Sequence, residues 1–410
     1  MKTKIIILLF IPFILIGQEH KSEITWKSSI EFESSSLDKN FLNSLLFTGY
    51  ITDSIKDHWL QSTEENNIIN GEIRNQFMYS YKFKNHNIKL SVADINLINT
   101  HFTNDFLHLG FEGNFAHQDK TLNFSNTNLR ANRFQQFKII YGSFINNINL
   151  NIGCSYLLGN HHINYIINEG SLYTAPYGAY LDLEYDVNAF MTDTSNLTAF
   201  ANNGEGVALD FSTNFNIMKH EIQFSLEDLG YIIWNPSSIS LNIDSVFTFR
   251  GIEIEDIYNF NDSILDASNI IEDINNTKNT SFKSYIPAII QFSIAKKLNY
   301  KYLYNYKAGV IAKWQPYMDN TLLSFDKIKQ GIEESNFKPL YYIHSIIKTK
   351  KYDLIPRISY GGYTNTTNIG LALSKGKKNK LIIGTNHLED IFAGDNAQNL
   401  SLYINIKLQF

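Results

Sequence analysis

The stretch LSLYINIKLQF, residues 400–410, alternates strictly between apolar and polar side chains. Successive side chains of a β-strand point to opposite faces, so this stretch has one wholly apolar face. Its length is about twice that of a mean strand in a soluble domain. A tilted strand needs roughly 9–11 residues to cross a bilayer. The stretch therefore predicts a strand that crosses a membrane with its apolar face toward lipid.

The same alternation recurs along the chain. It is clear in residues 148–158 (INLNIGCSYLL), 179–189 (AYLDLEYDVNA) and 207–217 (VALDFSTNFNI), and a short connection makes 206–230 a predicted hairpin. Unpaired backbone groups cost several kcal/mol in hydrocarbon, so a sheet in a membrane has to close on itself. We predict a closed antiparallel transmembrane β-barrel of about 14–18 strands, with an even total. A soluble β-sandwich is the alternative, but its strands are shorter.

The first seventeen residues have the pattern of a secretory signal peptide. Lys2 and Lys4 precede an apolar run from Ile5 to Ile16, and Gly17 marks the expected cleavage site. The run is shorter than the roughly 20 residues of a membrane-spanning helix, although an N-terminal anchor helix is the alternative. No later apolar run approaches that length. We predict a signal peptide over 1–17 and a single barrel domain over 18–410, placed in a bacterial outer membrane.

Composition agrees with a barrel and excludes some function classes. The chain has 29 Phe and 24 Tyr, only 18% charged residues, and a single cysteine, Cys154, so it forms no internal disulfide. Without Lys2 and Lys4 it has 33 basic and 40 acidic residues, a net charge of −7. A mildly acidic chain has no basic footprint, so we expect no nucleic-acid partner.

The end of the chain also suggests two partners. Phe410 is an aromatic residue at the end of a long amphipathic strand. It resembles the assembly signal that outer-membrane barrels present to their insertion machinery, although Asn405 replaces the glycine of the fuller signal. Outer-membrane lipid and the barrel-insertion machinery are therefore the expected partners of this strand.

Two segments interrupt the alternation. Residues 35–62 place Phe41, Leu42 and Leu45 at helical spacing, and residues 251–282 are acidic and compatible with helix. In a barrel, the first would be a plug and the second a connecting insert. Irregular loops are the alternative for both segments.

A series of short motifs carries a family resemblance over more than half of the chain. In order they are CSYLLG (154–159), NNGEGVALDFS (202–212), SLEDLGYIIW (225–234), FTFRGIEIEDI (247–257), SYIPAIIQFSIAKKLN (284–299) and GTNHLEDIF (384–392). This order resembles an outer-membrane barrel family of the Bacteroidota, known only as a domain of unknown function. Its members are broadly similar in build to FadL-like and PorV-like barrels. The resemblance implies a location and a fold, and it implies no reaction.

The glycines of NNGEGVALDFSTNF, residues 202–215, could suggest a phosphate-binding loop. A dinucleotide fingerprint needs a preceding strand, a following helix and a third glycine, whereas an alternating strand follows Gly204 and Gly206. We expect these glycines to let the chain turn into the start of a strand.

Four carboxylates on the polar faces of predicted strands are candidates for the lumen. Asp182, Glu184 and Asp186 form a row, and Asp210 lies on another strand beside Ser212. The row could form a cation constriction or a calcium site, but a solvated polar lining is the favoured interpretation because spaced carboxylates alone do not fix a metal geometry.

No catalytic motif appears, and we predict no enzyme, no cofactor and no metal site. His161 and His162 would point to opposite faces of a strand, so a rim loop is expected there. Cys154 shares the apolar parity and is expected to face lipid. Two functions fit: a FadL-like passage for a small solute gated by residues 35–62, or a non-enzymatic accessory barrel that docks a periplasmic or surface protein.

Overall fold

The computed structural model describes residues 21–37, 39–44, 49–193, 198, 200–250, 278–298, 300, 303–317, 324–376, 378–394 and 397–410. The predicted signal peptide lies outside these residues, and so does most of the predicted insert. No helix within the described ranges is long and apolar enough to cross a membrane.

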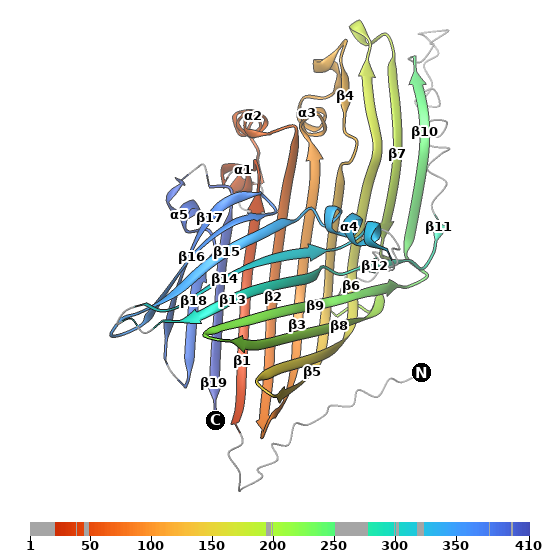
Figure 1. The fold of residues 1–410 in the computed structure, drawn as a ribbon. Coiled ribbons are helices and arrows are strands. Elements are labelled where there is room, and N and C mark those ends of the chain that lie inside the picture. The colour runs from red at the N-terminus through yellow and green to blue at the C-terminus, as the bar shows by residue number, and fades with distance from the viewer. Residues whose placement is uncertain are drawn as a thin grey trace.

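Fourteen antiparallel strands pair one after another, and the last pairs with the first, so the sheet is a closed barrel (Figure 1). This confirms the predicted fold and the even strand number. In ring order the strands are β1 (Lys21–Ser34), β2 (Asn66–Phe83), β3 (His86–Thr103), β5 (Asn128–Ile145), β6 (Ile148–Thr174), β8 (Gly204–Ile217), β9 (His220–Trp234), β13 (Ala288–Lys297), β14 (Leu303–Trp314), β15 (Lys338–Lys348), β16 (Asp353–Gly362), β17 (Thr366–Lys375), β18 (Lys380–Thr385) and β19 (Leu400–Gln409).

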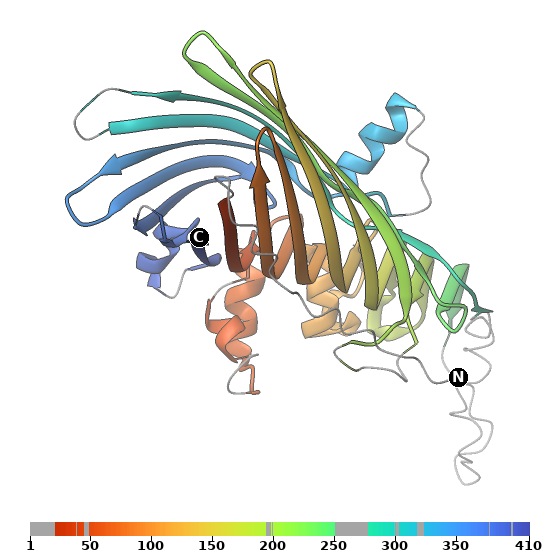
Figure 2. The ribbon, with the colours of Figure 1, turned by 90° about the horizontal axis from the view of Figure 1, so that it is seen from below.

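The seam of the barrel lies between β1 and β19, where Trp26 pairs with Ile406 and Ile30 with Leu402. We call the end where β1 begins and β19 ends the lower end, as it is drawn in Figure 1. Seen from that end, β13–β18 form one side of the ring and β1–β5 form the other (Figure 2).

The alternation predicted from the sequence sorts side chains between the two faces of the wall. On β19, Leu402 is 48% exposed on the outer face, whereas its neighbour Ser401 is 6% exposed inside. Cys154 is exposed on the outer face, as its parity predicts. The wall therefore presents an apolar outer surface and a polar inner surface, which is the arrangement that a bilayer requires.

One strand leaves the ring and forms an extension above it. The first half of β6 pairs with β8, while its second half pairs with β7 (Leu181–Met191), and β7 pairs in turn with β10 (Ile239–Phe249). β4 (Thr121–Asn123) also pairs with β6, and β11 (Lys278–Asn279) and β12 (Lys283–Tyr285) are short additions to β10 and β9. The extension projects beyond the upper end of the barrel (Figure 1).

Short helices gather near the upper rim (Figure 1). Thr52 caps α2 and Thr103 caps α3, each accepting a hydrogen bond from a backbone N–H of the first turn. The helices and 3-10 turns are α1 (Lys39–Asn43), α2 (Asp53–Ser62), α3 (Asn104–Glu112), η2 (Asn114–His117), η3 (Pro176–Gly178), α4 (Phe325–Glu333) and α5 (Leu388–Phe392).

The predicted plug does form helices, but they do not fill the lumen. Phe41 and Trp59, on α1 and α2, pack with Phe32, Ile69 and Phe102 at the upper ends of β1, β2 and β3. These three wall residues alternate with the residues of the inner face, so they belong to the outer face. The described helices of the predicted plug therefore lie outside the lumen, because their apolar side chains bury against the outer face at the upper ends of β1, β2 and β3.

Candidate functional site

A cluster of buried charges occupies the inner face of the wall. Lys138 on β5 places its Nζ 2.7 Å from Asp228 Oδ1 and 2.8 Å from Asp210 Oδ2. Gln136 donates to Asp228 Oδ1 at 2.7 Å, and Arg74 Nη1 lies 3.5 Å from Asp228 Oδ2. Asp228 on β9 thus pairs with side chains from two other strands of the wall, β5 and β2.

The backbone at Asp228 explains why an aspartate stands there. Its φ is 60°, in the left-handed region that Asp and Asn tolerate better than most residues. The register between β8 and β9 shifts between Leu209 and Phe211, which marks a bulge. The bulge turns the Asp228 N–H toward Asp210, whose Oδ1 accepts it at 2.7 Å.

The cluster continues across the lumen. Arg74 Nε donates to Glu72 Oε1 at 3.0 Å, and Glu72 Oε2 lies 3.7 Å from Lys313 Nζ. Glu72 is on β2 and Lys313 on β14, and these strands are seven positions apart in the ring of fourteen. Because they are opposite each other, this ion pair joins the two walls across the lumen.

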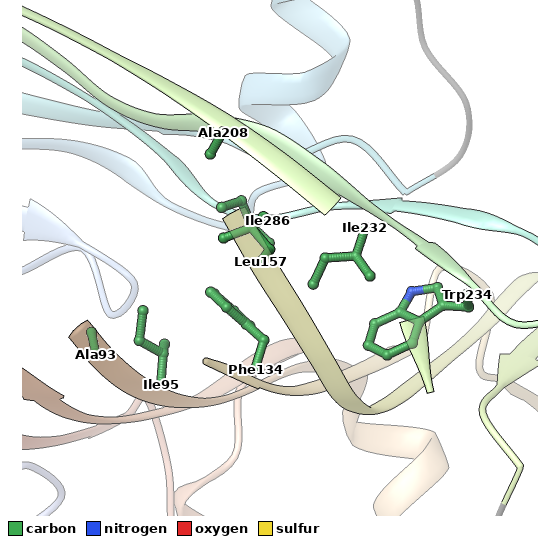
Figure 3. Packing of buried hydrophobic residues seen from close by; sticks show 8 residues of the cluster. All are labelled: Ala93, Ile95, Phe134, Leu157, Ala208, Ile232, Trp234 and Ile286. Carbon is green, nitrogen blue, oxygen red and sulfur yellow. The ribbon is translucent and has the colours of Figure 1, made fainter. Parts of the chain in front are cut away.

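An apolar layer lies beside the charges, on the inner faces of β3, β5, β6, β8 and β9 (Figure 3). Trp234 is its largest member and is 1% exposed. Its indole Nε1 donates to Ser284 Oγ at 2.8 Å, and its ring stacks on His162 at 5.1 Å between centroids. The layer consists of Ala93, Ile95, Phe134, Leu157, Ala208, Ile232, Trp234 and Ile286.

Gly204 and Gly206 make room for this layer. β8 begins at Gly204, as predicted, and neither glycine is among the residues with positive φ. A Cβ on Gly204 would lie 2.8 Å from the Trp234 ring, and one on Gly206 would lie 2.0 Å from the Tyr231 carbonyl oxygen. The expected turn into the strand stays a prediction, and the structure adds a reason for glycine at both positions, the close approach of β9.

A second closure lies above, where residues 334–337 fold in from the start of β15. Asn336 donates to Asn99 Oδ1 at 2.7 Å and to Asn128 Oδ1 at 3.2 Å, so it bridges to β3 and β5. Arg130 donates to the carbonyl oxygens of Gln315 and Glu334. These contacts tie the two walls together a second time.

Below the charged cluster lies a chamber of about 350 Å³. Its lining includes four cationic side chains and three carboxylates, together with amides and hydroxyls that favour water over apolar solutes. The charged residues are Lys27, Arg74, Lys89, Lys138, Asp210, Glu227 and Asp228.

The structure separates the carboxylates that were predicted to line the lumen. Asp210 lies inside the barrel in the charged cluster. Asp182, Glu184 and Asp186 lie on β7, which is part of the extension rather than of the fourteen-strand ring. These three residues therefore do not line the lumen of the ring as predicted. The reason is that β6 extends beyond the ring and β7 pairs with this upper part of β6. Asp182 accepts a hydrogen bond from Thr248, and Asp186 accepts one from Asn168.

Comparison with known proteins gives one family and several structural neighbours. A protein family described as a family of unknown function (DUF5723) matches residues 21–384. The chain belongs to this family. No curated protein matches it. Among solved structures, it is similar to a deltaS2S3 mutant of the monoaromatic hydrocarbon channel TodX (7% identity, 96% of this chain and 90% of that one, TM-score 0.41). It is also similar to a FadL homologue of Pseudomonas aeruginosa (8%, 95% and 89%, TM-score 0.40) and to the translocator domain of the autotransporter NalP from Neisseria meningitidis (7%, 96% and 89%, TM-score 0.35).

Several residues of the site in this DUF5723 protein were not predicted. Asp228 lies in the quoted motif SLEDLGYIIW, but nothing in its spacing indicates a bulge. His161 and His162 lie within β6 rather than in a rim loop, so that expectation is wrong. His162 is buried against Trp234, and its Nδ1 contacts Asn132 Oδ1. The sequence signal that could have pointed to the apolar layer is the pair Gly204 and Gly206, because glycines in a strand leave room for a large side chain such as Trp234 on the neighbouring strand.

His387, between β18 and α5, gives the rim a titratable contact. Burial lowers its pKa, but the nearby carboxylates of Glu33, Glu31 and Glu389, at 3.5, 3.9 and 3.5 Å from the ring nitrogens, outweigh burial and raise the pKa above its ordinary value. Asp390 is a further acidic neighbour. The folded protein therefore holds the His387 proton more tightly than the unfolded chain does.

This contact predicts a pH dependence of stability. Protonated His387 stabilises the folded protein fully below the pKa of a histidine in the unfolded chain, about 6.5. This contribution is lost as the pH rises through the higher pKa of His387 in the folded protein. We expect the free energy of unfolding to fall more steeply above about pH 6.5 in the native protein than in His387→Gln. Urea unfolding in detergent over a pH series measures the difference. Parallel curves for the two proteins would contradict the assignment.

Proposed function

We propose that this DUF5723 protein is an outer-membrane barrel that lets a small solute pass when its upper closure opens. The observation that carries the proposal is the closed ring, whose inner face borders a polar chamber. Among the described residues, side chains and the short loop 334–337 cross the lumen above it. The outer face is apolar and suits lipid. The similarity of the fold to the FadL homologue is consistent with such a passage.

The segment 334–337 is the part of the closure best suited to move. It is a short loop, and Asn336 has a φ of 56°. Each of the two hydrogen bonds from Asn336 contributes about 0.5–1.5 kcal/mol. Breaking them uncovers the inner faces of β3 and β5 without unpairing any strand. The helices α1 and α2, which pack on the outer face, have no such position.

Replacing Asn336 by alanine is expected to raise solute permeability. Losing both bonds removes roughly 1–3 kcal/mol from the closed state, and each 1.4 kcal/mol changes a population about tenfold. We therefore expect permeability to rise by about tenfold in a liposome-swelling assay with neutral sugars and small acids.

Asn365→Ala is the matched control for this experiment. Asn365 has a φ of 55°, nearly that of Asn336, but it lies exposed in the turn between β16 and β17. Both substitutions therefore carry the same backbone cost, and only one removes contacts across the lumen. Equal permeability in Asn336→Ala, Asn365→Ala and the native barrel would contradict a solute passage gated at this loop.

The extension favours a second candidate, a non-enzymatic accessory barrel that docks another protein. Asp186 pairs across the ladder with Asp244, and Glu184 pairs with Val246, which is exposed. An acidic, projecting sheet suits a basic partner at the cell surface or in the periplasm. Co-purification in mild detergent tests this candidate, and recovery of the barrel alone would count against it.

Export and assembly follow from the same proposal. We infer that residues 1–17 direct secretion. Phe410 lies exposed at the lower end of the seam, where its N–H donates to Ser22 O at 2.9 Å. The insertion machinery would meet this residue on the strand that closes the ring.

A further inference from the structure

Two histidines and a glutamate converge at the upper rim, outside the lumen. His108 and Glu112 lie one turn apart on α3, and His117 lies on η2. His108 Nδ1 and His117 Nε2 are each 2.7 Å from the same atom, Glu112 Oε2. The two imidazole rings are 5.3 Å apart and nearly perpendicular. Three potential metal ligands thus point at one place.

The chain is shaped to bring these side chains together. Gly113, between α3 and η2, has φ 75° and ψ 172°, a conformation that residues with a Cβ avoid. This reversal folds η2 back beside the last turn of α3. Without it, His117 would continue away from Glu112.

Both arms of the reversal are fixed to the extension above the ring. At the start of α3, Asp105 accepts the backbone N–H of Asn123 on β4 at 2.8 Å. Beyond η2, the Asp119 N–H donates to the Thr174 carbonyl oxygen on β6 at 2.8 Å. The three side chains are therefore held near their positions before any ligand arrives, which lowers the entropic cost of binding one.

We propose that His108, Glu112 and His117 bind a divalent transition metal, with zinc as the first choice. Two imidazole nitrogens and one carboxylate form a donor set that zinc accepts, with water in the fourth position. Their ligand atoms lie within 4.8 Å of one another. Two ligands with zinc bonds of about 2.0–2.1 Å in a tetrahedron lie about 3.3 Å apart, so the contacts need to open only slightly.

A bound metal would take the place of the protons in the hydrogen bonds that join His108 and His117 to Glu112. The side chains are between 15% and 37% exposed, which gives an ion access from solvent. Bound metal would link α3 to η2 and so tie the upper end of β3 to β6. The ion stabilises the rim by RT ln(1 + c/Kd), where c is the free metal concentration, because the three ligands converge in the folded state, so the gain grows with the logarithm of metal concentration above Kd.

Zinc binding by the purified full-length barrel in detergent, without a histidine tag, tests the proposal. A competition titration with a chromogenic chelator should show one zinc ion per chain. We expect His108→Ala and His117→Ala each to weaken binding by at least tenfold. His220→Ala, at the start of β9 at the lower end, should bind like the native protein.

Glu112→Gln separates a metal site from a simple hydrogen-bonded triad. The glutamine keeps the shape and an acceptor oxygen, so a hydrogen-bonded rim would survive, whereas the anionic ligand is lost. We expect zinc to raise the denaturation midpoint of the native barrel and of His220→Ala, but not of Glu112→Gln. Absence of binding by the native protein, or equal binding by Glu112→Gln, would overturn the proposal.

Discussion

Replacing Asp228 by alanine is expected to lower the free energy of unfolding of the barrel by about 3–5 kcal/mol, because removing one partner of a buried ion pair leaves the other charge uncompensated. Lys138 would keep only Asp210, and Gln136 would lose its acceptor. Arg74 would also lose its contact across the lumen. Denaturant unfolding in detergent, followed by tryptophan fluorescence, measures the loss.

Asp119→Ala separates the charge effect from the backbone effect. Asp119 also has a φ of 60°, so both substitutions place alanine in the left-handed region at a cost of roughly 1–2 kcal/mol. Asp119, however, is outside the barrel, and its carboxylate accepts a hydrogen bond from the Tyr173 hydroxyl. A loss in Asp228→Ala no larger than that in Asp119→Ala would show that the charged cluster contributes little to stability.

Replacing Trp234 by alanine is expected to cost about 3–5 kcal/mol, the range for deleting a large buried aromatic side chain. Gly159 and Gly204 have no side chain to move into the space, and both lie against the Trp234 ring. The cavity would therefore stay open, and Ser284 and His162 would lose their contacts.

Trp26→Ala is the control for this substitution. Trp26 is on the outer face of β1, where it is exposed to the surroundings of the barrel and encloses no cavity. The same unfolding measurement should give a much smaller loss for Trp26→Ala. Equal losses at the two positions would contradict the importance of the apolar layer inside the wall.

Alternation predicted the barrel because it is a local property of the chain. In 400–410 each residue fixes the face of its neighbour, and the structure confirms that Ser401 lies inside and Leu402 outside. The hairpin 206–230 was also predicted from local sequence, because two strands joined by a short connection pair with each other. Asp210 was assigned to the inner face by parity alone, and it lies there.

The alternation of side chains could not show whether the row Asp182, Glu184 and Asp186 lies in the lumen or in the extension. β7 alternates as well as any strand of the ring, but whether it closes the ring depends on its partners. β6 is 27 residues long, so it pairs with β8 below and with β7 above. Nothing in the sequence of β7 shows which part of β6 it meets.

The sequence by itself determined the strands, their inner and outer faces and the closed sheet, because these depend on neighbouring residues and on the cost of unpaired backbone groups. Only the tertiary structure decided what blocks the lumen. Glu72 meets Lys313, and Asn336 meets Asn99, across sequence separations that no local pattern spans. The helices of 35–62 lie outside because the apolar surface available to them is on the outer face of β1–β3, a fact that depends on the assembled wall.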